Sequence, residues 1–218
     1  MTRLVFVHGS VTNARLSWGK QAPLARRYEL VTPDRPGFPG GPPAPRVDFA
    51  LDADWLPTIL EPGDVLVTHS YGGLGALLAA SSLPVSRLVL LEPPAFRLAW
   101  DDPAVQAWVA GAAALPRDSP ESYLRAFFPH VGAPFPPPDP LTPDWRNGAE
   151  LFYDERLPTE AEIELAPLPY PVLVVTGAHS AAFDAVADAL VAGLSAERAV
   201  IPGAGHAIQL APGFNALF

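Results

Sequence analysis

Residues 64–80 constrain the chain more than any other segment, because they read DVLVTHSYGGLGALLAA. The apolar run Val65–Val67 predicts a buried strand, and Leu74–Ala80 predicts a short apolar helix. Ser70 lies at the turn between them, where its hydroxyl would stand clear of the sheet edge at a helix N-terminus. Gly72 lets the strand and the helix approach closely. Ser70 is therefore a candidate nucleophile, and such a serine requires a histidine base and donors for an oxyanion.

The rest of the chain alternates apolar strands with helical stretches. Six strands are predicted, over Arg3–Val7, Glu29–Thr32, Asp64–Thr68, Arg87–Leu91, Val172–Thr176 and Ala199–Ile201. Helices are predicted over Ala14–Arg27, Asp48–Leu60, Gly73–Ser82 and Ala182–Leu194. This pattern is typical of the α/β class, with a mostly parallel sheet covered by helices on both faces. In such sheets ligands bind beyond the carboxyl ends of the strands.

Residues 95–167 break this alternation. They are helical in parts, rich in proline and rich in aromatic residues. Because the segment follows the carboxyl end of one predicted strand, it is expected to lie over the site as a lid. Residues 1–94 and 168–218 then form the core, and residues 95–167 form a lid or cap insertion.

Composition excludes several classes of function. The 218 residues carry a formal net charge of −9, Lys20 is the only lysine, and cysteine is absent. We therefore expect no nucleic-acid partner, no disulfide and no thiolate metal site. No run of 18 apolar residues predicts a membrane span, and no motif predicts a nucleotide cofactor or a metal. A cytoplasmic protein with a small apolar substrate and no cofactor is expected, and its oligomeric state is left open.

Six motifs in order carry a resemblance: VFVHGS, PDRPGF, THSYGG, LVLLEPP, VLVVTG and PGAGHAIQL. Together they resemble the α/β-hydrolase superfamily over nearly the whole chain. The resemblance implies that Ser70 is the nucleophile and that His206 is the general base. It also implies that the backbone N–H groups of Ser10 and Tyr71 form the oxyanion hole.

The nucleophile turn departs from the family pattern at one position. The family sequence is usually G-x-S-x-G, and here Thr68 replaces the first glycine. Threonine adds bulk where the strand and helix cross, so the turn is expected to open slightly. The alternatives are that Ser70 only caps a helix and that His206 is a surface loop residue. The other histidines, His8, His69, His130 and His179, are expected to be structural.

The third member of a catalytic triad is less clear from the sequence. Ser180 stands where most of the family has its acid. Glu92 ends a predicted strand, a position where some members such as the haloalkane dehalogenases place the acid. Asp184 is an alternative about one helical turn beyond Ser180, and a dyad without an acid is another. We favour Glu92, because a carboxylate after the apolar run Leu88–Leu91 needs a partner. It could instead be a structural glutamate that binds a loop amide.

These inferences predict a serine hydrolase that cleaves a small or medium apolar carboxylic ester through an acyl-enzyme intermediate. A lactonase, a thioesterase or a C–C bond hydrolase would use similar residues at the same site. Dehalogenase and epoxide-hydrolase chemistry is disfavoured, since those relatives need a carboxylate where Ser70 stands. A ligand-binding protein without catalysis and a partner-dependent scaffold also remain open.

Overall fold

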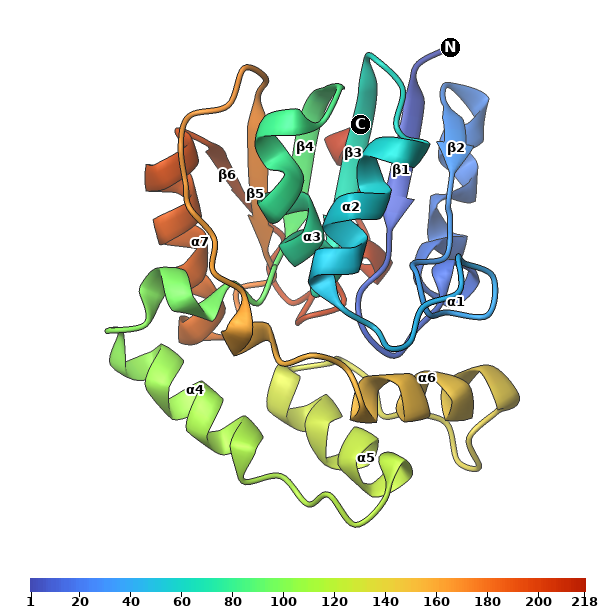
Figure 1. Cartoon of the computed structure of the whole chain (residues 1–218), viewed down its shortest axis with the longest axis vertical. Coiled ribbons are helices and arrows are strands. Elements are labelled where there is room, and N and C mark those ends of the chain that lie inside the picture. Colours follow the sequence, from blue (N-terminus) through green and yellow to red (C-terminus); the bar gives the residue numbers. More distant parts are fainter.

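Six short strands form one sheet in which every neighbouring pair is parallel, in the order β2-β1-β3-β4-β5-β6 (Figure 1). This computed structural model describes all 218 residues. The strands are β1 (Arg3–Val7), β2 (Glu29–Val31), β3 (Asp64–His69), β4 (Val85–Leu91), β5 (Val172–Thr176) and β6 (Glu197–Val200). The predicted α/β class is confirmed, and the sheet is parallel throughout rather than mostly so.

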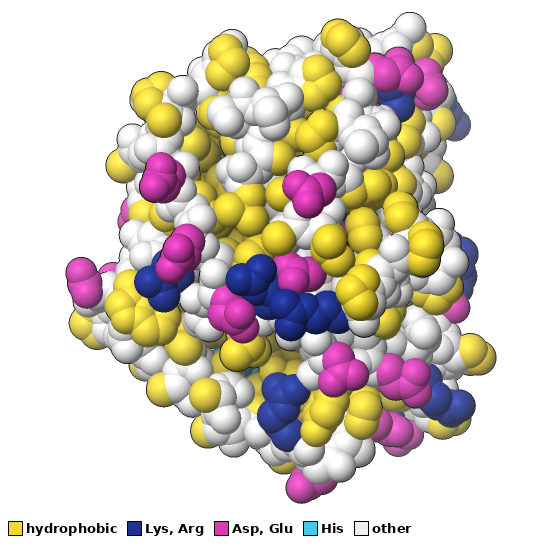
Figure 2. All heavy atoms as spheres, viewed as in Figure 1, with side chains coloured by type: hydrophobic (Ala, Val, Ile, Leu, Met, Phe, Trp, Pro, Cys, Tyr) yellow, Lys and Arg dark blue, Asp and Glu magenta, His cyan; other side chains and the backbone are white.

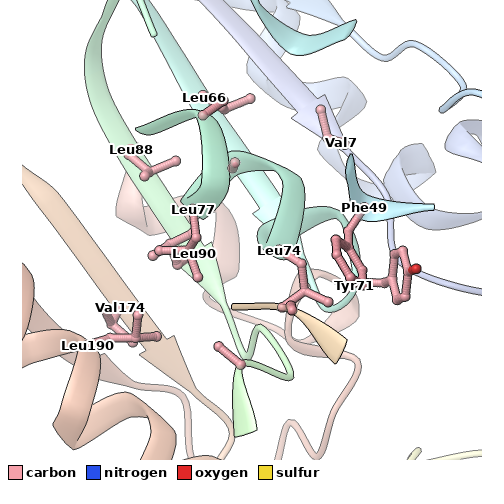
Figure 3. Packing of buried hydrophobic residues seen from close by; sticks show 14 of the residues in the cluster. Val7, Phe49, Leu66, Tyr71, Leu74, Leu77, Leu88, Leu90, Val174 and Leu190 are labelled. Atoms are coloured by element: carbon pink, nitrogen blue, oxygen red, sulfur yellow. The ribbon is translucent and has the colours of Figure 1, made fainter. Parts of the chain in front are cut away.

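Alternate strand residues point to opposite faces of the sheet, as the two-residue period of a strand requires. On one face Leu66, Leu88 and Val174 pack against three helices (Figure 3). These helices are α2 (Phe49–Ile59), α3 (Gly72–Ala79) and α7 (Ala181–Leu194). Because both sides of the central strands are fully buried, their sequences are continuous apolar runs rather than alternating ones.

The opposite face is covered by shorter elements. Phe6, Val67 and Val89 pack there against residues such as Trp18 and Phe214. The covering elements are α1 (Ala14–Trp18) and the 3₁₀ segments Gly19–Arg26, Ile208–Leu210 and Phe214–Leu217. Both faces of the sheet are therefore covered, as predicted. A further 3₁₀ turn, Ala80–Ser82, follows α3.

The bounds of most predicted elements shift by one to three residues, and two of the differences have a clear physical cause. The helix predicted over Ala14–Arg27 is α-helical only to Trp18 and continues as a 3₁₀ segment, which fits with Pro23 inside it since proline cannot donate an α-helical hydrogen bond. The last strand was predicted over Ala199–Ile201 but spans Glu197–Val200. It is an edge strand with mostly exposed side chains, so a search for a buried apolar run misplaces it.

The segment between β4 and β5 forms a separate helical layer beyond the carboxyl ends of the strands (Figure 1). It comprises a 3₁₀ turn (Phe96–Ala99), α4 (Pro103–Ala113), α5 (Pro120–Val131), α6 (Pro143–Tyr153) and a second 3₁₀ turn (Pro158–Glu160). Tyr123, Phe128 and Phe152 form an apolar cluster between α5 and α6 that also includes Val11 of the core. None of the helices is both long enough and apolar enough to cross a membrane.

Charged side chains join this layer to the core. Arg156, just beyond α6, pairs with Asp48 at 3.3 Å and with Glu160 at 3.1 Å. Asp48 also caps α2 by accepting the Ala50 amide. Figure 2 shows basic and acidic side chains gathered along this boundary. The insertion is thus anchored to the N-terminus of α2.

A buried ion pair ties three segments of the core together. Arg35 is fully buried, and its Nε donates to Asp52 Oδ2 at 2.9 Å. Its Nη1 donates to the carbonyl of Gly9 at 2.9 Å. The guanidinium also lies over the Tyr71 ring, with Cζ 4.7 Å from the ring centroid. One side chain therefore links the loop after β2 to α2 and to the loop after β1.

Replacement of Asp52 by alanine should leave the Arg35 guanidinium buried without its counter-charge. We expect this substitution to lower the free energy of unfolding by about 3–5 kcal/mol. The matched control is Asp54→Ala on the exposed face of the same helix, which should change it by less than about 0.5 kcal/mol. Urea unfolding followed by circular dichroism measures both, and equal losses would contradict the assigned role of the ion pair.

Candidate active site

Ser70 lies at a sharp turn between β3 and α3, with a positive φ of 51°. Its amide donates to the carbonyl of Leu91 in β4 at 2.8 Å. A Cβ added to Gly72 would lie 2.5 Å from the carbonyl oxygen of His8. Only glycine therefore lets α3 start this close to the loop after β1, and the strained turn projects the Ser70 hydroxyl beyond the sheet.

Thr68, the departure from the family pattern, is fully buried in β3. A Cβ added to Gly73 would lie 3.4 Å from Thr68 Oγ1 and 2.8 Å from Pro93 Cβ. A side chain at Gly73 would therefore clash with Pro93, whereas it would make only an ordinary contact with the threonine hydroxyl.

His206 comes from the loop after β6 and lies beside Ser70. Its Nε2 is 2.9 Å from Ser70 Oγ, and its Nδ1 is 2.8 Å from Glu92 Oε2. With the imidazole proton on Nδ1, this nitrogen donates to Glu92 and Nε2 accepts from the serine hydroxyl. The structure brings the three predicted residues into one hydrogen-bonded chain, which is the geometry that proton transfer from serine to histidine requires.

Glu92 is the first residue after β4 and is buried, with a positive φ of 42°. Its Oε1 accepts the Gly177 amide at 2.7 Å, and its Oε2 accepts from His179 Nε2 at 2.8 Å as well as from His206. Burial alone would raise the pKa of this carboxyl, but the hydrogen bonds from His179, His206 and Gly177 outweigh burial and lower it to about 2. Glu92 therefore stays ionised at neutral pH, and it also binds a loop amide.

Asp184, the alternative acid, has a different partner. It lies in the first turn of α7 and accepts from Arg198 at 2.5 Å, with 42% of its side chain exposed. Ser180 is the N-cap residue of that helix. Neither residue contacts His206, whereas Glu92 does.

Two of the histidines expected to be structural hold backbone near the site. His69 Nε2 donates to the carbonyl of His206 at 2.8 Å. Burial and the nearby His206 lower the pKa of His69 to about 3. His8 Nε2 accepts the Arg35 amide at 3.1 Å, and burial together with the Arg35 charge lowers the pKa of His8 to about 3. Both rings therefore stay neutral and act as fixed hydrogen-bonding groups.

A third histidine expected to be structural, His130, lies in the insertion. Its Nε2 donates to the carbonyl of Trp108 at 3.0 Å.

His179 is the residue whose contact the sequence analysis missed. The sequence predicts a structural role for it, yet its Nε2 donates to Glu92 Oε2, the same oxygen that accepts from His206. A signal was present, because His179 adjoins Ser180, the position where the usual acid is absent. The loop after β5 thus supplies hydrogen-bond donors to the Glu92 carboxylate rather than an acid of its own.

Tyr71 directly follows Ser70 in the chain, and Ser10 lies in the loop after β1. A Cβ added to Gly9 would be 2.9 Å from Ser70 Cβ, so the loop after β1 packs directly on the serine. Neither amide donates to a protein acceptor. Two free donors beside a serine are what an oxyanion hole requires.

A cavity of about 460 Å³ opens over Ser70 and His206. Most of its lining is apolar, and the insertion contributes Trp108, Phe127 and Phe152. The insertion thus covers the site with aromatic side chains, which suits an apolar substrate.

Three side chains here could also act as metal ligands. Atoms of Glu92, His179 and His206 lie within 4.8 Å of one another. In the structure, both imidazoles are instead engaged with the carboxylate through hydrogen bonds of 2.8 Å. The arrangement already satisfies the buried Glu92 charge.

The comparisons with known proteins agree with this architecture. The model of the Alpha/beta hydrolase family matches residues 4–214. The chain matches no curated protein sequence.

Three solved structures illustrate the likeness. MenH from S. aureus has a TM-score of 0.68 at 18% identity, over 99% of this chain and 91% of that chain. Carboxylesterase CesB (YbfK) from Bacillus subtilis has a TM-score of 0.58 at 20% identity, over 96% and 78%. Est816, described as an N-acyl homoserine lactone degrading enzyme, has a TM-score of 0.57 at 22% identity, over 100% and 92%. At these identities the likeness shows the fold alone.

The lowered pKa of Glu92 should make stability depend on pH. Because its pKa is about 2 rather than the ordinary 4.5, ionised Glu92 stabilises the native state above pH 4.5, and this contribution disappears as the pH falls through 2. The unfolding free energy of the wild type should therefore fall relative to that of Glu92→Gln by about 1.4 kcal/mol for each pH unit below 4.5, which is about 2 kcal/mol at pH 3. Urea unfolding at pH 7, 5, 4 and 3 measures the difference, and a constant difference would contradict it.

Proposed function

The chain belongs to the alpha/beta hydrolase family, and we propose that within this family it is a serine hydrolase that cleaves a small or medium apolar carboxylic ester. The observation that carries the proposal is the chain of hydrogen bonds from Ser70 through His206 to Glu92 at the floor of an apolar cavity. Fold alone does not decide function in this family, so the proposal depends on this site.

In the acylation step, Ser70 Oγ attacks the ester carbonyl carbon while His206 Nε2 takes its proton. The carbonyl π electrons move onto oxygen, and the amides of Ser10 and Tyr71 donate to the resulting oxyanion. When the C–O bond to the alcohol breaks, the electron pair leaves with the alcohol oxygen, which takes the proton from His206. An acyl-enzyme on Ser70 remains.

In the deacylation step, His206 removes a proton from water, and the hydroxide oxygen attacks the acyl carbon. Collapse of the second tetrahedral intermediate releases the acid and returns the proton to Ser70. Glu92 stays ionised throughout, because its hydrogen bonds hold its pKa at about 2. Its negative charge stabilises the imidazolium and keeps the ring oriented.

The cavity supports an apolar substrate of limited size. Its lining is mainly hydrophobic, and most of the aromatic part comes from residues 95–167, to which we assign the role of lid. Lactones are the leading alternative substrate, since Est816 shares the fold and a lactone is a cyclic ester open to the same attack. Hydrolysis of a thioester, or of a C–C bond next to a carbonyl, would use the same residues.

Reaction with a fluorophosphonate tests whether Ser70 is an activated nucleophile. The wild type should be labelled at Ser70, and Ser70→Ala should abolish both labelling and ester hydrolysis while circular dichroism shows an unchanged fold. Mass spectrometry locates the label, and a panel of esters, lactones and thioesters ranks kcat/KM. A folded wild type that is neither labelled nor active would instead favour a ligand-binding role.

Substitution of each acid separates the two candidates. Glu92→Gln should lower kcat by at least about 100-fold, because the neutral amide neither orients nor stabilises the imidazolium. Asp184→Asn should change kcat by less than about threefold, since Asp184 pairs with Arg198 instead. Steady-state kinetics on the best ester measures both, and small, equal losses would remove Glu92 from the mechanism.

A further inference from the structure

One acidic side chain in the cavity has no part in the mechanism above. Glu155 follows α6 by two residues and lines the cavity. Its Oε1 accepts a 2.6 Å hydrogen bond from Ser10 Oγ, while its Oε2 is buried without a partner in the protein. A buried carboxyl with an unmatched oxygen is costly, so this position calls for a physical reason.

The charges around Glu155 leave it without a counter-ion of its own. Arg35 is the buried cation that faces it, and Arg35 already pairs with Asp52 of α2 at 2.8 Å. The phenols of Tyr71 and Tyr123 also interact with Glu155 and add no positive charge. Arg117 lines the same cavity, but it lies over the Tyr123 ring and donates to the carbonyl of Tyr153. One guanidinium cannot neutralise two carboxylates. Because Asp52 already pairs with Arg35, Glu155 is most stable as the neutral acid.

Burial of the Glu155 side chain also favours its neutral, protonated form. It raises the pKa of Glu155 to about 8, although Arg35 and the Ser10 hydroxyl act in the opposite direction. At neutral pH the side chain is therefore mainly protonated. It accepts from Ser10 through its carbonyl oxygen.

The loop that Glu155 contacts is held by the insertion at a second point. Val11, next to Ser10, has a positive φ of 68°, which is strained for a β-branched residue. A Cβ added to Gly148 of α6 would lie 1.7 Å from the carbonyl oxygen of Val11. Helix α6 thus packs against the backbone of the loop, and the residues after the helix bind the Ser10 side chain.

We propose that Glu155 is a positioning residue of the oxyanion hole, which holds the Ser10 amide on target through the Ser10 hydroxyl while contributing no negative charge beside the oxyanion. This inference rests on the proposed function, because it acts through the donor assigned there to Ser10. Two consequences follow. Removal of the acceptor should weaken oxyanion binding at any pH, and ionisation of Glu155 should weaken it at alkaline pH because like charges repel.

Three variants test the proposal, with the rate of Ser70 labelling by a fluorophosphonate measured from pH 6 to 9.5. Glu155→Leu removes the acceptor and should slow labelling about 10-fold or more at every pH. Glu155→Gln keeps an acceptor that never ionises, so it should recover most of the lost rate at pH 7. The control is Asp154→Asn, the exposed neighbour, which should behave as the wild type.

The shape of the pH profile distinguishes positioning from simple packing. The wild-type rate should fall above about pH 8, and Glu155→Gln should lack this decline. In steady-state hydrolysis, Glu155→Leu should lose kcat with KM changed by less than about twofold, because the oxyanion forms only after nucleophilic attack and is absent from the bound substrate.

Thermal unfolding tests the neutral acid independently of activity. The unfolded chain loses the Glu155 proton near pH 4.5, whereas the native state keeps it to about pH 8. Between these values the unfolded state binds fewer protons, so the native wild type loses stability as pH rises. The Tm of Glu155→Gln should therefore increase relative to the wild type from pH 5 to 8 and then level off.

The outcomes are separable. A wild type that is not labelled overturns the proposed function and this inference with it. A labelled wild type whose Glu155→Leu variant reacts at the wild-type rate overturns this inference alone. So does a Glu155→Gln variant that keeps the alkaline decline, or one whose Tm difference from the wild type does not change with pH.

Discussion

The Glu92 carboxylate is the interaction on which the site depends. It directly follows β4 in a strained conformation, yet three donors from two other loops meet on its two oxygens. Gly177 and His179 come from the loop after β5, and His206 comes from the loop after β6. A buried charge is tolerated only when it is satisfied in this way. The same ion that holds the His206 ring thus binds the carboxyl ends of three neighbouring strands to one another.

The insertion supports the site as well as covering it. At the C-terminus of α5, the carbonyl of Gly132 accepts the His206 amide at 3.0 Å. At α6, Gly148 packs on Val11, and beyond the helix Glu155 binds Ser10. The loop that carries His206 and the loop that carries Ser10 therefore both contact residues 95–167. Under our proposal, displacement of the lid would disturb both loops, which couples cavity opening to the state of the site.

Local patterns predicted a large part of this. Apolar runs located β1 to β5 to within two residues of their observed bounds, the edge strand β2 included, and the glycines after Ser70 located the turn. Prediction was weaker where the local signal was weak. The edge strand β6 exposes most of its residues, and Pro23 turned a predicted helix into a 3₁₀ segment. Glu155 lies in no motif, and the signal for His179 was only its place beside Ser180; their partners lie 145 and 87 residues away in the chain.

The sequence by itself determined the parallel sheet, the serine at the turn and the candidacy of Glu92 and His206. Strand periodicity and turn geometry depend on residues close together in the chain, so they can be read from it directly. Only the tertiary structure decided that Glu92 rather than Asp184 faces His206, that His179 shares its carboxylate, and that Glu155 lies against Ser10. Those pairings depend on how strands and helices distant in sequence pack, and on which charges are buried together, and neither property is encoded locally.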